Sequence, residues 1–357
     1  MSLLVLSASN VETATASMSP DELQLLMVNV FRTLSSGHAA LSSAPLRTSI
    51  SMSQHTALFM PARIATEALT GTTIKVVSVP SSPGDTRGLP GSTLVLNENT
   101  GAVQAMVNSR SLTALRNAAG SLLSTRVVGL VSPTSIVAFG SGKQIQAHLS
   151  LFLRTFPSLT RCAIVNRSAN ARLQKLVDGL QENFPTAQVA AHEFSMANPT
   201  EGDAAVEEAV RAASIVICAT SSTSALFPSV WARAGAHVIL IGSYKPHMKE
   251  VETDLVRRAL AHALIVDSRD ACAHEAGELL EAKVDMGAVA EIGELVEDDG
   301  VGGIRTLLPR PEGMENNGGV TMFKSVGVGL QDVAIACAAL EKACAMGLGT
   351  MIDDYDE

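Results

Sequence analysis

The amino-acid sequence predicts an α/β protein in which a doubly wound parallel sheet is inserted into a domain of mixed strands and helices. The first observation is length, since the chain has 357 residues and one hydrophobic core rarely extends beyond about 250 residues. The second is a series of short apolar runs that alternate with helical patterns from residue 131 to residue 320. The third is a final helical pattern after this series, which returns the chain to its first domain.

The first 130 residues combine helices with β-rich segments. Residues 3–11 predict a strand, and the sequence Ser-Pro-Asp-Glu from Ser19 starts a helix with a capping box and a proline at its first position. Strands are predicted at 72–80 and 92–101, joined by a long loop rich in proline and glycine. A helix of small residues follows at about 112–128. These segments form the predicted first domain, residues 1–130.

Five apolar runs predict the strands of the inserted domain, residues 131–320: SIVAFG, CAIVNRS, SIVICAT, HVILIGS and ALIVD. They do not alternate between apolar and polar residues, and helical patterns separate several of them. Such strands belong to a parallel sheet that is covered on both faces, and right-handed crossovers make it doubly wound. Residues 291–319 predict an irregular return loop. The last helix, at about 328–346, places residues 321–357 with the first domain.

Composition excludes several classes of protein. The net charge is −9 and only 3% of the residues are aromatic, whereas nucleic-acid binding needs a basic surface and, for single strands, aromatic platforms. The five cysteines form no C-x-x-C pair, which predicts reduced thiols and no metal site. No signal peptide and no apolar run of about 18 residues is evident, so we expect a cytoplasmic protein that does not enter a membrane.

A glycine-rich turn predicts a nucleotide cofactor. Gly140 and Gly142 directly follow a predicted strand and open a helix, where unpaired N–H groups and the positive end of the helix dipole favour phosphate. The third position of the G-x-G-x-x-G pattern is Ile145, so a plain strand turn is the alternative. The strand–helix–strand context favours cofactor binding. The predicted contacts are Gly140, Ser141, Gly142, Lys143 and Gln144.

The next predicted strand ends in Asn166, Arg167 and Ser168, where a site for NAD usually carries an acidic residue. An amide, a guanidinium and a hydroxyl suit the 2′-phosphate of NADP(H), so we expect NADP(H) to be preferred and NAD(H) to be the alternative. Arg167 could also lie over the adenine ring or be a solvated loop residue.

A second polar loop follows a later strand. The hydroxyls of the segment CATSST fit close passage beside a ribose or nicotinamide, although a generic turn has the same composition. The predicted contacts there are Thr220, Ser221 and Ser222.

Together these segments resemble the ornithine cyclodeaminase/mu-crystallin family over most of the chain. The similar segments come in the family's order: LTALRNAA, GSGKQIQAHL, CATSST, AGAHVILIGSYKP, ALIVDS, HEAGEL and TMFKSVGVGLQD. The resemblance implies a Rossmann-type domain inserted into a domain that forms the homodimer and holds most of the substrate site.

The resemblance also implies site residues. Arg47, Lys75 and Arg116 match the family's positions for a substrate carboxylate, whereas without the resemblance each would be read as a solvated cation. Guanidinium groups bind carboxylates through paired hydrogen bonds, and a buried lysine can hold charge or move a proton. Asn117 and Ser325 are expected to contact the cofactor.

Three positions depart from the family pattern. Tyr244 stands where ornithine cyclodeaminases carry an aspartate that engages the distal amine of the substrate, which disfavours that activity. Gly91 replaces a frequent threonine of the substrate pocket, and Asn117 replaces the threonine of the R-T-A-A segment.

The leading interpretation is an NAD(P)H-dependent oxidoreductase that reduces the C=N bond of a ketimine or imino-acid carboxylate, or catalyses the reverse amino-acid dehydrogenation. Two alternatives stay open: a redox-neutral ornithine cyclodeaminase that recycles its bound cofactor, and a noncatalytic protein that binds NADPH or a small ligand. The loops at 81–91 and 291–319 are expected to select the substrate side chain.

Overall fold

The computed structural model describes residues 2–45, 47–81, 88–197, 203–300, 303–308 and 318–356. The chain divides into two compact units. Unit 1 comprises Met1–Arg116, Gly300–Gly303 and Val328–Glu357, and unit 2 comprises Asn117–Asp299 and Ile304–Gly327. The sequence placed the limits at residues 130 and 320 instead. In the structure, the first boundary between the units lies inside a helix. The second boundary lies after a strand that the sequence assigned to the first domain.

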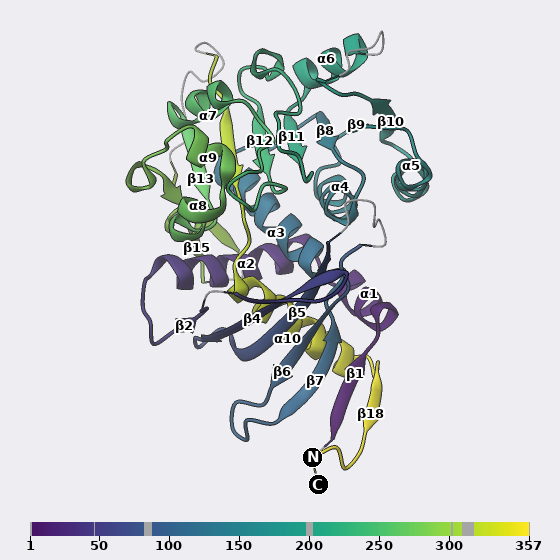
Figure 1. Ribbon diagram of the computed structural model, residues 1–357, viewed down its shortest axis with the longest axis vertical. Helices are drawn as coiled ribbons and strands as arrows, with labels where there is room; N and C mark the ends of the chain where they lie inside the picture. The colour runs from purple at the N-terminus through teal and green to yellow at the C-terminus, as the bar shows by residue number, and fades with distance from the viewer. Residues whose placement is uncertain are drawn as a thin grey trace. The chain divides into compact units, whose positions relative to one another are not determined.

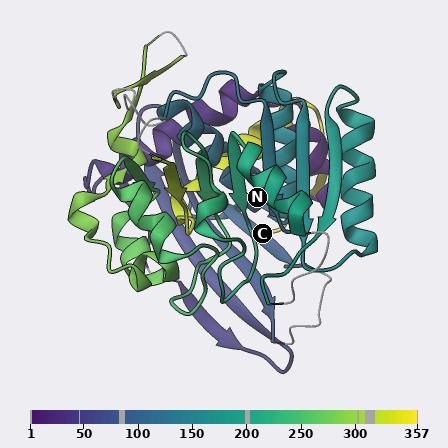
Figure 2. The same ribbon diagram turned by 90° about the horizontal axis from the view of Figure 1, so that it is seen from above.

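Unit 1 contains a mixed sheet in the order β18-β1-β7-β6-β5-β4-β2, with β3 also paired to β4. The strand β1 runs parallel to β7 and antiparallel to β18, so strands from opposite ends of the chain lie side by side (Figures 1 and 2). The strands are β1 (Leu3–Leu6), β2 (Ser42–Ser43), β3 (Thr48–Ser51), β4 (His55–Ala65), β5 (Thr70–Pro80), β6 (Gly91–Leu96), β7 (Val103–Asn108) and β18 (Thr350–Ile352).

Helix α10 packs on the central strands β4, β5, β6 and β7 of this sheet, and α1 and α2 contact α10 (Figure 1). The bounds are α1 (Ala8–Ala16), α2 (Pro20–Ser35) and α10 (Gly329–Ala345). The predicted capping box of α2 is confirmed, since Ser19 Oγ accepts from Glu22 N at 3.1 Å and Glu22 Oε2 accepts from Ser19 N at 2.7 Å. The first predicted strand was too long, because Ser7 and Asn10 form a second capping box that starts α1.

Unit 2 contains a parallel sheet in the order β10-β9-β8-β11-β12-β17-β13-β14. The chain goes from β8 outward to β10 and then returns to place β11 on the other side of β8. That reversal is the topological switch point of a doubly wound, Rossmann-like fold, and the predicted fold class is confirmed. The strands are β8 (Ser135–Phe139), β9 (Arg161–Asn166), β10 (Gln188–Glu193), β11 (Ile215–Cys218), β12 (His237–Leu240), β13 (Ala263–Val266), β14 (Ala290–Glu291) and β17 (Thr321–Lys324).

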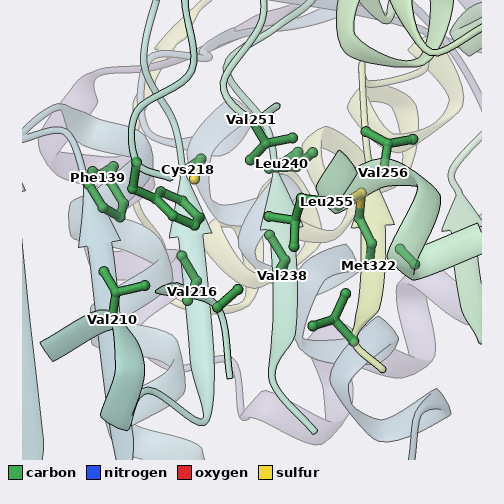
Figure 3. Packing of buried hydrophobic residues seen from close by; sticks show 14 of the residues in the cluster. Phe139, Val210, Val216, Cys218, Val238, Leu240, Val251, Leu255, Val256 and Met322 are labelled. Atoms are coloured by element: carbon green, nitrogen blue, oxygen red, sulfur yellow. The ribbon is translucent and has the colours of Figure 1, made fainter. Parts of the chain in front are cut away.

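Helices connect these strands and cover the sheet. They are α3 (Leu112–Val127), which enters from unit 1, α4 (Lys143–Thr155), α5 (Ala171–Asn183), α6 (Asp203–Ala212), α7 (Thr253–Leu260), α8 (Arg269–Glu275), α9 (Gly277–Glu281), and the 3₁₀ turns η1 (Ser229–Trp231), η2 (Met286–Ala288) and η3 (Ile292–Glu294). Apolar side chains from strands and helices form one core, which includes Phe139, Val216, Val238, Leu255 and Met322 (Figure 3). This core fixes the carboxyl ends of the strands, where the predicted cofactor residues lie.

Two features of this region were not predicted. Strand β17 lies between β12 and β13, with Phe323 opposite both Ile239 and Ile265, so residues 321–327 belong to unit 2 and not to the first domain. The region predicted as an irregular return loop includes a hairpin of β15 (Val296–Asp298) and β16 (Ile304–Thr306). Most of the glycine- and proline-rich loop predicted at 81–91, between β5 and β6, consists of residues 82–87, which lie outside the described residues.

No helix in the described part of the chain is long and apolar enough to span a membrane. Among the same residues, no group of three or more histidine, cysteine, aspartate or glutamate side chains is arranged to hold a metal ion.

Candidate functional site

The basic cluster of unit 1 consists of Lys75, Arg116, Asp332 and Gln331, with Arg47 nearby. Lys75 lies on β5, where Gly71, Thr73 and Lys75 are the buried, alternate residues of the strand. Because side chains alternate between the two faces of a strand, Lys75 shares the face of β5 that is buried in unit 1. There it meets Asp332 from the first turn of α10, at 2.9 Å from Nζ to Oδ2.

Arg116 meets the same aspartate from the other side. Its Nε donates to Asp332 Oδ1 at 3.2 Å, and its Nη1 donates to Gln331 Oε1 at 2.6 Å. Gln331 also caps α10, since its Oε1 accepts from Val328 N at 3.2 Å. The side chains of Lys75, Arg116 and Asp332 are buried, with exposed fractions of 4%, 6% and 5%. The strand, the helix start and α3 therefore bring two predicted residues together on one buried carboxylate.

The charges in this cluster shift the pKa values in a consistent way. Burial alone would raise the pKa of Asp332, but the charges of Arg116 and Lys75 outweigh it and the pKa is lowered. Burial lowers the pKa of Lys75, Asp332 opposes this effect, and the charges of Arg116 and Arg47 add to it. Arg47 is itself exposed. Asp332 thus remains ionised, while Lys75 releases its proton more easily than a solvated lysine does.

Asp332 and Gln331 were not among the predicted site residues. They are adjacent polar residues in the buried first turn of a helix that is otherwise mostly apolar, and both are almost completely buried. A buried carboxylate needs a partner, so such a polar pair was the available signal in the sequence. The partners themselves lie more than 200 positions away, at Lys75 and Arg116.

In unit 2, the glycine turn lies at the switch point of the parallel sheet. Gly140 has a φ of +115°, and its N–H donates to Val165 O at 2.8 Å. A Cβ at Gly140 would lie 3.0 Å from Ala219 O, so a side chain would press against the neighbouring loop. A Cβ at Gly142 would meet nothing within 4 Å. The turn is therefore close to its protein neighbours on one side and open on the other.

This turn fits a dinucleotide. Gly142 is the N-cap of α4 and provides no side chain to bond the first N–H groups of the helix, which consequently suit a pyrophosphate. Ser141 is half-buried, and Lys143 is exposed with its Nζ donating to Gln146 Oε1 at 3.0 Å. Gln144 is half-buried, and its buried Oε1 has no hydrogen-bond partner among the described residues.

The loop after β9 keeps Arg167 in solvent. Asn166 Nδ2 donates to Ser168 O at 2.7 Å, so this amide shapes the loop. Arg167 is exposed, and within the described part of the chain it forms no hydrogen bond or ion pair. Glu193, at the end of the adjacent strand β10, accepts from Ala169 N at 2.9 Å. The loop therefore offers one unengaged guanidinium beside the predicted ribose position.

The loop after β11 is held in place by a buried glutamate that was not among the predicted site residues. Thr220 N and Oγ1 both donate to Glu250 Oε1, at 2.7 and 3.0 Å. Ser222 is half-buried and its Oγ donates to Ser224 O at 2.7 Å, whereas Ser221 is exposed. Glu250 lies in a loop six residues after Tyr244, and no sequence pattern there would have identified it.

The two remaining predicted contacts are buried within unit 2. Ser325 is 3% exposed and its Oγ donates to Asp267 Oδ2 at 2.7 Å, so its hydroxyl hydrogen is used inside the protein. Burial raises the pKa of Asp267, while the hydrogen bonds from Ser325 and Gly327 oppose that shift. Asn117 is 8% exposed on α3. Their contact with a cofactor stays a prediction.

The sequence and the fold are similar to those of known proteins. The sequence profile of the ornithine cyclodeaminase/mu-crystallin family matches residues 2–346. The chain belongs to this family. It is 27% identical to mouse ketimine reductase mu-crystallin over 301 residues, which is 82% of each chain. It is 25% identical to Δ1-pyrroline-2-carboxylate reductase of Bacillus cereus over 318 residues, 87% of this chain and 89% of the relative.

A solved relative has the same fold. The Δ1-pyrroline-2-carboxylate reductase of Thermococcus litoralis, whose structure holds NADH and L-proline, superposes with a TM-score of 0.78 at 24% identity. The superposition covers 97% of this chain and 99% of the other. Family membership thus rests on the sequence match, and the fold of both units is shared along nearly the whole chain.

Proposed function

We propose that this member of the ornithine cyclodeaminase/mu-crystallin family is an NAD(P)H-dependent reductase of cyclic or linear imino-acid carboxylates, with amino-acid dehydrogenation as the reverse reaction. The observation that carries the proposal is the buried group of Lys75, Arg116 and Asp332, in which two cations share one carboxylate. A substrate carboxylate adds the second negative charge. The names of the mouse and Bacillus relatives support the same substrate class.

Each residue of the basic cluster has a different role in the proposed reaction. The guanidinium of Arg116, oriented by Asp332 and Gln331, binds the substrate carboxylate together with Arg47. Lys75 gives a proton to the imine nitrogen, since burial has lowered its pKa toward the working range of a general acid. When bound, a nicotinamide cofactor would supply the hydride for the imine carbon. Asp332 fixes the positions of both cations and stays ionised throughout.

The cofactor residues lie in unit 2. The glycine turn from Gly140 to Gln144 would hold the pyrophosphate, and Thr220 would lie along the ribose or nicotinamide. Arg167 would pair with the 2′-phosphate, because it is exposed and unengaged within the described residues. We therefore expect NADPH to bind more tightly than NADH in a fluorescence titration, and tighter NADH binding would contradict this assignment.

One experiment separates the proposed reaction from its alternatives. The purified protein is mixed with NADPH and Δ1-pyrroline-2-carboxylate or Δ1-piperideine-2-carboxylate, and NADPH oxidation is followed by absorbance. Both imino acids should be reduced. The matched control is 1-pyrroline, which has the same C=N bond but no carboxylate for Arg116 to bind, and it should react at least about 100-fold more slowly because a buried charge pair is lost.

Other outcomes would replace the proposal. Ammonia release from ornithine without net NADPH change would show a cyclodeaminase, although Tyr244 is half-buried beside Lys245 where the family's aspartate would stand. NADPH binding without turnover of any imine would show a noncatalytic binding protein. Equal rates with and without the carboxylate would contradict the binding of this group by Arg116 and Arg47.

A further inference from the structure

Unit 2 buries a second set of charged residues, the acidic cluster, made of Glu250, Glu278 and Lys324. All three are fully buried. Lys324 closes β17, and its Nζ pairs with Glu278 Oε1 at 2.8 Å and donates to Ser243 O at 2.5 Å. Glu278 lies on α9. One lysine therefore faces two carboxylates, which leaves one negative charge that other groups must stabilise.

The second carboxylate, Glu250, is stabilised by backbone N–H groups. Its Oε1 accepts from Thr220 N at 2.7 Å and from Thr220 Oγ1 at 3.0 Å, and its Oε2 accepts from Gly242 N at 2.7 Å. Thr220 follows β11 and Gly242 follows β12, and these strands are neighbours in the sheet. Both oxygens of one side chain thus tie together two loops at the carboxyl edge.

The two loops that Glu250 joins are packed so closely that Gly242 has no room for a side chain. A Cβ at Gly242 would overlap the backbone of Thr220 and lie 2.5 Å from Glu250 Oε1. On the other side, the loop after β11 touches the glycine turn, since a Cβ at Gly140 would lie 3.0 Å from Ala219 O and 3.5 Å from Thr220 Cγ2. A shift of the Glu250 carboxylate would therefore be transmitted to Thr220 and on to Gly140.

We propose that Glu250, in its ionised form, is a positioning residue for the nicotinamide cofactor: it fixes the loops after β11 and β12 against the glycine turn, so cofactor affinity depends on its charge. This inference rests on the proposed function, because it assumes that unit 2 binds NAD(P)H. Glu250 itself lies beneath the loops and acts only through Thr220 and Gly242.

The charge of Glu250 changes near neutral pH. Burial raises its pKa to about 7, the charge of Lys324 opposes this shift, and Glu278 adds to it. The other titratable group facing it is the thiol of Cys218 on β11, whose pKa burial raises well above 9, so that thiol stays neutral. In a protonated carboxyl, one oxygen carries the proton and becomes a donor, and this oxygen is a weaker acceptor toward Gly242 N or Thr220 N than a carboxylate oxygen. Protonation therefore loosens one of the two loops.

The test is the dissociation constant of the apo protein for NADH and NADPH, measured by fluorescence titration from pH 6 to pH 8.5. For wild type, the constant for NADH should rise about tenfold between pH 8 and pH 6, because the ionised form of Glu250 becomes a minority below its pKa. NADH is the primary probe since it lacks the 2′-phosphate, which also titrates near pH 6. A flat wild-type profile would overturn the inference.

Glu250→Gln imitates the protonated side chain. It should bind NADH about tenfold more weakly at pH 8 and show little change down to pH 6. Glu252→Gln is the matched control, since Glu252 Oε2 also accepts from a backbone N–H and a hydroxyl, at 2.7 and 2.5 Å, but from Ser229. That control should retain the wild-type profile.

The outcomes distinguish the two proposals. Wild type that binds neither NADH nor NADPH at pH 8 would overturn the proposed function and this inference together. Wild type that binds, with Glu250→Gln equal to it in affinity and slope, would overturn only the role of Glu250. If Glu250→Gln does not fold, the wild-type and Glu252→Gln profiles still decide, because both proteins retain the titrating carboxylate.

Discussion

Both compact units bury a group of three charged side chains, and the balance of charge is opposite in the two. In unit 1, two cations, Lys75 and Arg116, share Asp332. In unit 2, one cation, Lys324, faces Glu278 and Glu250. Burying a charge is expensive unless it is paired and hydrogen-bonded, so the charge that is in excess within each group must be stabilised by further groups.

The two groups solve this problem differently. The extra carboxylate of unit 2 accepts hydrogen bonds from Thr220 and Gly242 inside the protein, and it holds their two loops in place. The extra cation of unit 1 is suited to the carboxylate of a substrate. In unit 2, backbone N–H groups balance the net charge of the buried group, which indicates that the group positions the loops. In unit 1, the buried group has a net positive charge beside a candidate proton donor, which indicates that it binds a ligand.

The largest expected effect is on turnover, when the cation of unit 1 that moves a proton is removed. Lys75→Met keeps most of the side-chain volume but removes the acid, so kcat/KM for Δ1-pyrroline-2-carboxylate should fall roughly 10²- to 10⁴-fold. The affinity for NADPH should change less than about twofold, since the cofactor residues lie in unit 2. Steady-state kinetics and fluorescence titration measure the two quantities.

Lys342→Met is the control for this change, because Lys342 pairs with Glu22 on the exposed side of α10. It should keep wild-type kinetics. Wild-type turnover by Lys75→Met would show that water supplies the proton, and the contrast between the two charged groups would lose its functional meaning.

The next effect is on stability, when the anion shared by two cations is neutralised. Asp332→Asn leaves Lys75 and Arg116 buried without their common carboxylate, and removal of one partner from a buried pair costs about 3–5 kcal/mol of unfolding free energy. A carboxylate ligand such as L-proline should restore part of the loss. Urea unfolding with and without L-proline measures both terms.

Glu341→Gln on the exposed side of the same helix is the comparison and should change the unfolding free energy by less than about 0.5 kcal/mol. Equal stability of Asp332→Asn and wild type would contradict the view that this carboxylate offsets the buried positive charge.

The smallest effect is on the pH dependence of stability, to which each buried, neutral histidine of unit 2 contributes. Burial lowers the pKa of His148 to about 4 and that of His237 to about 3. Each histidine is protonated more readily in the unfolded chain, at its ordinary pKa of 6.5, so stability falls as the pH drops below 6.5. The expected slope is about 1.4 kcal/mol per pH unit for each histidine.

The shift of Glu250 has the opposite sign. Its raised pKa gives the folded state an extra proton between pH 4.5 and about 7, so this contribution is lost as the pH rises through 7. Denaturant unfolding at pH 7, 6 and 5 should show that His148→Gln reduces the acid slope by about 1.4 kcal/mol per unit, whereas Glu250→Gln increases it by a similar amount. An unchanged slope in both variants would show that these groups do not titrate as their burial implies.

Local patterns in the sequence were sufficient for the parallel sheet and its glycine turn. The apolar runs that became β8, β9, β11, β12 and β13 are each buried along their whole length or nearly so, and such burial leaves a continuous apolar signal. Gly140 and Gly142 were found because a strand–turn–helix junction demands particular backbone conformations within a few residues.

The sequence by itself thus determined the fold class, the glycine turn at the switch point and, through family resemblance, the basic residues that belong to unit 1. Only the tertiary structure decided that β17 enters the parallel sheet, that Asp332 joins Lys75 to Arg116, and that Glu250 ties Thr220 to Gly242. The reason is physical: periodicity and turn chemistry act between near neighbours, whereas a buried charge takes whichever partner the packed chain brings to it. For Lys75 that partner is 257 residues away.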